Sequence, residues 1–181
     1  MPDSSVEVPM NAVPTGLWLG PEDSFYVGQL TGFPFPVGGA NVYRVNPAGS
    51  DPVLHSDGYT NIIDVAFAPN GDLYVLEFTS GGMLNIDPTD PATLTGNLIR
   101  ITPDNQRDVV VAGLVTPTGL TIADDGTIYV ANMGTMAGAG QVLRFEAPEP
   151  AAGTEAADEA TADEATAEDD AGDEAEATPV A

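Results

Sequence analysis

Three stretches of this chain repeat one short pattern at a fixed spacing. Each copy opens with a tetrad and, after a turn, continues into a second tetrad that carries a tyrosine; the pairs are 14–17 with 24–27, 62–65 with 72–75, and 117–120 with 127–130. In every copy the third residue of the opening tetrad precedes the tyrosine by ten positions; these residues are Gly16 and Tyr26, Asp64 and Tyr74, and Gly119 and Tyr129. Such constant spacing predicts one supersecondary unit used three times.

Each copy predicts antiparallel strands, because β-branched and aromatic residues recur between turn signals. The first two strands of a copy are joined by a tight turn with a glycine, Gly71 in the second copy and Gly126 in the third. The first copy has residues 20–23 there and lacks that glycine, so its turn is predicted to differ. A third strand with a recurring arginine follows at 41–45, 97–101 and 141–145, and a fourth follows twice, at 52–55 and 108–111.

Four strands in a repeat of about 40–50 residues are typical of the blade of a β-propeller. The sequence therefore predicts an all-β fold within residues 1–145, with three four-stranded blades at about 13–55, 62–112 and 116–145. The third blade lacks an outer strand of its own, and a spare strand is predicted at 5–8, before the first blade. The strand pattern is thus out of phase with the blade boundaries, as it is in propellers whose two termini share one blade.

Three blades are fewer than the four to eight of ordinary propellers. Two explanations stay open. The chain is half of a six-bladed ring whose other half belongs to a longer protein, or two chains join head to tail and each N-terminal strand completes the last blade of the other.

Composition divides the chain at about residue 145. Residues 146–181 are almost wholly Ala, Glu, Asp and Thr, with 13 acidic side chains and no base, and we predict that this tail is disordered. The whole chain has a net charge of −24, which excludes nucleic acid as a natural partner. No apolar run is long enough to predict a membrane span, and the N-terminus has no basic segment of the kind that begins a signal peptide.

The repeat resembles NHL-type propellers. More specifically, residues 26–43, with the loop Gly-Phe-Pro-Phe-Pro-Val-Gly-Gly at 32–39, and residues 62–67 are similar to the ScyD/ScyE family, named after the cyanobacterial gene cluster for the pigment scytonemin. The resemblance covers about residues 6–145. It implies the C-terminal half of a six-bladed propeller that is extracellular or periplasmic in its full-length form. It carries over no catalytic residue.

The third residue after each repeat tyrosine is polar: Gln29, Glu77 and Asn132. All three stand at the end of a second strand, where the chain turns onto one face of the propeller. Together with Asp64, which replaces the glycine of the other copies, they form a candidate Ca²⁺ or polar-substrate site at the mouth of the axis. The alternative is that these side chains satisfy backbone groups of nearby turns.

The connections between second and third strands leave on the same face, and they are unusually apolar. Phe33, Phe35, Met83, Met133 and Met136 are therefore candidate ligand-binding residues. The alternative is that the loops fold down and cap the core of the ring. A small hydrophobic ligand or a partner protein is the expected occupant.

The first functional hypothesis is an exported, non-enzymatic propeller that binds a ligand or a protein through these loops. The alternative is a metal-assisted hydrolase or lactonase with a polar site at the propeller axis. Propellers serve both classes, so the fold does not choose between them.

Overall fold

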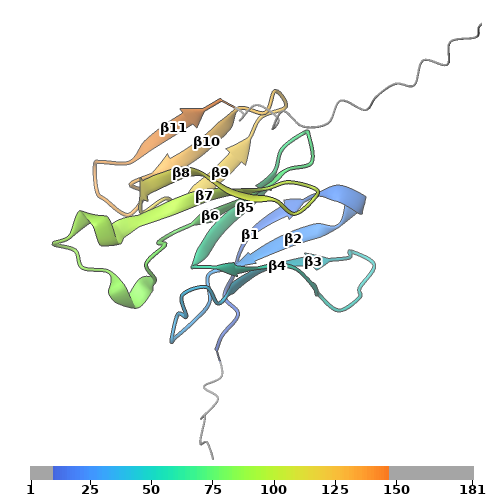
Figure 1. The fold of residues 1–181 in the computed structure, drawn as a ribbon, viewed down its shortest axis with the longest axis horizontal. Coiled ribbons are helices and arrows are strands. Elements are labelled where there is room, and N and C mark those ends of the chain that lie inside the picture. The colour runs from blue at the N-terminus through green and yellow to red at the C-terminus, as the bar shows by residue number, and fades with distance from the viewer. Residues whose placement is uncertain (1–9, 147–181) are drawn as a thin grey trace, which may run out of the picture. The chain divides into compact units, whose positions relative to one another are not determined.

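The computed structural model describes residues 10–146, and there the chain forms three antiparallel sheets and three short 3₁₀ turns, without an α-helix (Figure 1). The first sheet contains β1 (Pro14–Leu19), β2 (Phe25–Gln29), β3 (Ala40–Val45) and β4 (Val53–Tyr59). The second contains β5 (Ile62–Phe67), β6 (Leu73–Glu77), β7 (Thr95–Ile101) and β8 (Arg107–Val115), and the third contains β9 (Gly119–Ile122), β10 (Ile128–Asn132) and β11 (Gln141–Phe145). The predicted strand at 5–8 and the predicted tail from residue 147 onward lie outside the described residues.

Within each sheet the strands pair in chain order, which is the meander of a propeller blade. The first strands of successive sheets lie side by side, with β1 next to β5 and β5 next to β9. The prediction of an all-β fold built from propeller blades is confirmed. No helix of the described part of the chain is long and apolar enough to cross a membrane.

Strand register confirms that the three copies are structurally equivalent. The repeat tyrosines stand opposite the repeat arginines in every sheet, as the pairs Tyr26 and Arg44, Tyr74 and Arg100, and Tyr129 and Arg144. The turn of the first copy differs as predicted: it forms the 3₁₀ turn η1 (Pro21–Asp23), in which Glu22 and Asp23 have positive φ. In the other two copies the matching glycine, Gly71 or Gly126, takes the positive φ.

The fourth strands are longer than the sequence predicts. β4 continues to Tyr59 and β8 to Val115, whereas strand was predicted only over 52–55 and 108–111. Both are edge strands with mostly exposed side chains, so apolar alternation does not mark their full length. Both also pass through a glycine with positive φ, Gly58 or Gly113, close to an irregularity in the register with the third strand.

The hydrophobic core lies between the sheets, in two clusters that we call the first and second seams. The first seam joins the first and second blades, and its buried residues are Tyr26, Ala40, Val42, Tyr59, Ile62, Val65, Leu73, Val75, Ile99 and Ile101. The second seam joins the second and third blades and contains Ala66, Tyr74, Leu76, Leu98, Leu114, Leu120, Ile122, Ile128 and Val130. Trp18 contacts both clusters. The blades are therefore stabilised mainly by apolar packing against the adjacent blades.

Candidate functional site

The loops after β2 and β6 form an exposed apolar surface. Phe33 and Val37 lie on the first of these loops and Leu84 on the second, within the 3₁₀ turn η2 (Met83–Asn85), and each has more than half of its surface exposed. Phe35 and Met83 lie beside them and are half-buried. We call these five residues the loop face. Their exposure shows that the loops do not simply fold onto the core.

One buried side chain joins the two loops. The Asn61 side-chain amide donates to the Leu30 carbonyl oxygen at 2.9 Å, and its Oδ1 accepts from the Met83 backbone N–H at 3.1 Å. A third bond runs from the Gly38 N–H to Thr60 Oγ1 at 3.0 Å. Both loops are therefore tied to the connection between β4 and β5. Asn61 is not predictable as a site residue from the sequence, because a single asparagine in front of a strand carries no distinguishing pattern.

The loops also touch directly. A Cβ atom built on Gly82 would lie 2.7 Å from Val37 Cγ2, so the backbone of the second loop runs against the first. The rings of Phe33 and Phe35 face each other edge-on, with centroids 6.5 Å apart. The structure thus brings together three of the predicted ligand-binding residues, Phe33, Phe35 and Met83.

The other two predicted ligand-binding residues lie on the loop after β10. Met133 and Met136 are half-buried, and the Met133 sulfur accepts a long contact from the Gln141 side chain at 3.9 Å. This loop joins β10 to β11 and is the third-blade equivalent of the loops after β2 and β6. The contacts that join the first two loops do not include them.

The predicted polar positions are equivalent, as their spacing required. Gln29, Glu77 and Asn132 end β2, β6 and β10, and all three are buried. Glu77 is anchored: Oε1 accepts from the Thr60 backbone N–H at 2.8 Å and Oε2 from the Asn97 side chain at 3.3 Å. Burial raises the pKa of Glu77, although these two hydrogen bonds oppose the shift.

Asp64 connects two blades. Its Oδ2 accepts from the Leu120 backbone N–H at 2.8 Å, and its Oδ1 accepts from the Val65 N–H at 2.9 Å. The first of these bonds links the inner strands β5 and β9. Burial raises the pKa of Asp64 as well, again against the hydrogen bonds. This carboxylate therefore has a clear structural role.

Gln29 and Asn132 differ from Glu77 in a way that matters for ligand binding. Gln29 Oε1 and Asn132 Oδ1 are buried and have no hydrogen-bond partner among residues 10–146. Orphaned amide oxygens suit a hard cation or a ligand donor. Within residues 10–146, however, no three His, Cys, Asp or Glu side chains come together as metal ligands, and the two carboxylates already have separate backbone partners. The Ca²⁺ site at Gln29, Asp64, Glu77 and Asn132 stays a prediction.

Known proteins of similar sequence and fold include gluconolactonases. A gluconolactonase of Zymomonas mobilis subsp. mobilis is 27% identical over 124 residues, which are 65% of this chain and 33% of that protein. A solved gluconolactonase from Xanthomonas campestris superposes with a TM-score of 0.53 at 16% identity, over 75% of this chain and 45% of that one. A streptogramin B lyase structure gives a TM-score of 0.44 at 13% identity, over 77% and 42%. No protein-family model matches.

The likeness to the Xanthomonas structure shows the fold: the chain is a β-propeller. It spans about a third of the curated relative and less than half of the two solved proteins. Identity of 16% to a solved structure supports the fold and nothing finer. The resemblance to the ScyD/ScyE family, and the extracellular or periplasmic location that it implies, stay predictions.

Proposed function

We propose that this chain is the ligand-binding part of a gluconolactonase-like propeller and that it holds a small hydrophobic ligand on its loop face. The observation that carries the proposal is the exposure of Phe33, Val37 and Leu84 on two loops that are fixed in place by buried Asn61. Contiguous exposed apolar side chains on a rigid scaffold are typical of a binding surface.

The energetics favour such a ligand. Burial of apolar surface contributes about 25 cal/mol per Å². Because the two loops are already held by hydrogen bonds to Asn61 and Thr60, binding orders little additional chain. The strong negative charge of the chain disfavours an anionic ligand, so a neutral or cationic one is expected.

A neutral dye measures this surface. We expect the double variant Phe33→Ser with Leu84→Ser to bind Nile red at least about fivefold more weakly than the unmodified chain, because each change removes about 1 kcal/mol or more of apolar contact. Fluorescence titration of the full-length proteins gives the two dissociation constants.

Val109 supplies the matched control. It is an exposed aliphatic residue on the edge strand β8, away from the loops. Val109→Ser removes a comparable apolar side chain and is expected to leave dye binding unchanged. Equal losses in Val109→Ser and in the loop variant would contradict the proposed binding surface.

A second candidate function is hydrolysis of a sugar lactone, and the observation that favours it is the sequence identity with the Zymomonas gluconolactonase. In this reaction water adds to the lactone carbonyl, the ring C–O bond breaks, and the acid formed releases a proton. Glu77 is the candidate base, because burial raises its pKa and Thr60 holds its carboxylate in place. A bound cation, held by the predicted set, would polarise the carbonyl.

Proton release from glucono-1,5-lactone tests this candidate. If it is correct, the full chain accelerates release above the spontaneous rate, and Glu77→Gln lowers the acceleration about 100-fold or more. Asp57→Asn, which removes an exposed carboxylate on β4, is expected to have no effect. Thermal stabilisation by millimolar Ca²⁺ that is lost in Asn132→Ala would support the predicted cation set. Full activity in Glu77→Gln would remove this assignment.

A further inference from the structure

Among residues 10–146, the first and third blades each leave one flank uncovered, and the exposure of equivalent residues shows this directly. Leu17 on β1 corresponds to Val65 on β5 and to Leu120 on β9. Leu17 is 61% exposed, whereas Val65 and Leu120 are 0% and 7% exposed, because a preceding blade covers them. The first blade has no preceding blade among the described residues.

The third blade shows the converse. Val142 on β11 corresponds to Val42 on β3 and to Leu98 on β7. Val142 is 70% exposed, but both Val42 and Leu98 are fully buried under the blade that follows. The same side chain position is therefore core in two blades and surface in the third.

Each uncovered flank carries a groove. The groove on the first blade has a volume of about 260 Å³ and is lined mostly by apolar side chains, among them Val27, Tyr43 and Val45, with Gln29 also in its wall. The equivalents of these residues in the second blade, Val75, Ile99 and Ile101, belong to the first seam. A second groove of about 260 Å³ lies along Tyr129, Ala131 and Val142 of the third blade, with Asp64 of the second blade at its edge.

These two grooves are the two halves of one missing seam. In the first seam, Tyr26 and Val42 of the first blade pack against Val65 and Val75 of the second. In the second seam, the equivalent residues Tyr74 and Leu98 of the second blade pack against Leu120 and Val130 of the third. On the third blade the equivalents of Tyr26 and Val42 are Tyr129 and Val142, and on the first blade the equivalents of Val65 and Val75 are Leu17 and Val27. The chain therefore carries both surfaces of a third seam.

A hydrogen bond between the first and second blades also has its equivalent groups on the two uncovered flanks. Thr15 in the first blade donates its hydroxyl to the carbonyl oxygen of Ile62 in the second blade at 2.7 Å. The equivalent of Thr15 in the third blade is Thr118, which is exposed, and the equivalent of Ile62 in the first blade is Pro14. A hydrogen bond from Thr118 to Pro14 of another copy would repeat the contact seen within the chain.

We propose that two copies of this chain join head to tail, with the third blade of each on the first blade of the other, and close a six-bladed ring. Three blades are below the four to eight of closed propellers and six are within that range. A head-to-tail contact between identical chains ends in a ring when its rotation closes. Both junctions repeat the seams already present in each chain.

The edges of the blades agree with this ring. In the part of the chain that the structure describes, β11 pairs with no fourth strand, whereas β3 pairs with β4 and β7 with β8.

Light scattering during size-exclusion chromatography tests the ring. The full chain is expected to elute with twice the 18.6 kDa mass of one chain. Salt should strengthen the dimer, because each chain has a net charge of −24 and screening weakens the repulsion. Leu17→Lys alone and Val142→Asp alone are expected to elute at the mass of one chain, while Val109→Asp, on an exposed edge strand, remains a dimer.

Mixing the two flank variants gives the decisive result. Val42 and Val65 share the first seam, and Leu98 and Leu120 share the second, so Val142 and Leu17 are expected to meet in the third. A mixed dimer of Leu17→Lys with Val142→Asp has one unaltered junction and one that pairs opposite charges, so mixing should restore the doubled mass. Circular dichroism of each variant checks that its sheets persist.

Two results would overturn the proposal. One is an unmodified chain that elutes at 18.6 kDa with its strand signal intact, which would assign the flanks to further blades of a longer protein. The other is a series of growing oligomers, which would show that the head-to-tail contact does not close.

Discussion

Gly96→Ala is expected to destabilise the protein strongly, because the added methyl group would collide with the backbone of the neighbouring strand. A Cβ atom at Gly96 would lie 1.8 Å from the Glu77 carbonyl oxygen and 2.9 Å from the carbonyl oxygen of Phe78. Backbone atoms cannot rotate away as a side chain can, so β6 and β7 would have to separate at this point. We expect a loss of about 3 kcal/mol or more in the free energy of unfolding.

Thermal unfolding followed by circular dichroism measures this change, and a drop of about 10 °C in Tm corresponds to it. Gly81→Ala is the matched control, since a Cβ there meets no atom within 4 Å. It adds the same methyl group in the loop that leads from β6 toward β7 and should leave Tm nearly unchanged. Similar Tm values for the two variants would mean that the close approach of β6 and β7 is not rigid.

This prediction depends on the structure and would have been missed from the repeat. The residue equivalent to Gly96 in the first blade is Ala40, which is buried and pairs with Tyr59 next to a register shift. A reader of the sequence would conclude that alanine is tolerated at this position. The third and fourth strands of the two blades have register shifts at equivalent positions, so the difference lies in the close approach of the Glu77 carbonyl group to Gly96, about which periodicity carries no information.

The regular part of the fold was predictable because the same strand pairing and the same kind of turn recur in the copies of the repeat. Tyr26, Tyr74 and Tyr129 occupy the same place beside an arginine, and the turn glycines Gly71 and Gly126 are needed for positive φ. The full fourth strands were not predictable. They lie at blade edges, where solvent replaces the packing that produces apolar alternation.

In the candidate site, the positions of the residues could be predicted from the sequence, but their hydrogen-bond partners could not. Spacing alone placed Gln29, Glu77 and Asn132 at equivalent strand ends. It could not distinguish a carboxylate that holds the Thr60 backbone from an amide oxygen with no partner, because that difference depends on the neighbouring connection. The joining of two loops through Asn61 is likewise a tertiary contact between residues 31 positions apart.

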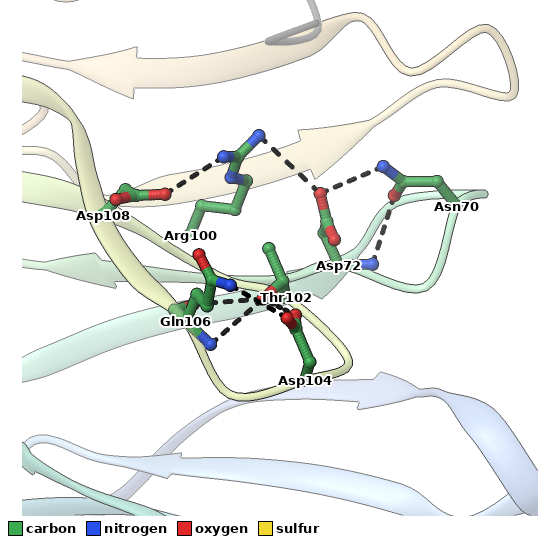
Figure 2. A network of polar contacts seen from close by, with 7 residues as sticks. All are labelled: Asn70, Asp72, Arg100, Thr102, Asp104, Gln106 and Asp108. Carbon is green, nitrogen blue, oxygen red and sulfur yellow. Dashed lines mark hydrogen bonds and ion pairs between the residues drawn. The ribbon is translucent and has the colours of Figure 1, made fainter. Parts of the chain in front are cut away.

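Arg100→Met is the second change with a large expected effect. Arg100 is buried, and its guanidinium bonds Asp108 Oδ2 at 3.0 Å and lies 4.0 Å from Asp72 Oδ2 (Figure 2). Asp72 is also buried, and after the change Asn70 would be its remaining side-chain donor. Because an uncompensated charge in the interior is costly, we expect the free energy of unfolding to fall by about 3 kcal/mol. Urea denaturation measures the loss.

The repeat provides an internal control for this prediction, since Arg44 occupies the same position in the first blade. Its partner Glu22 is exposed, so Arg44→Met is expected to cost less than about 1 kcal/mol. Asp72→Asn in the Arg100→Met background should recover part of the loss, because it removes the stranded charge. Equal losses in Arg44→Met and Arg100→Met, with no recovery in the double variant, would show that packing of the arginine stem, which both positions share, outweighs the buried ion pair.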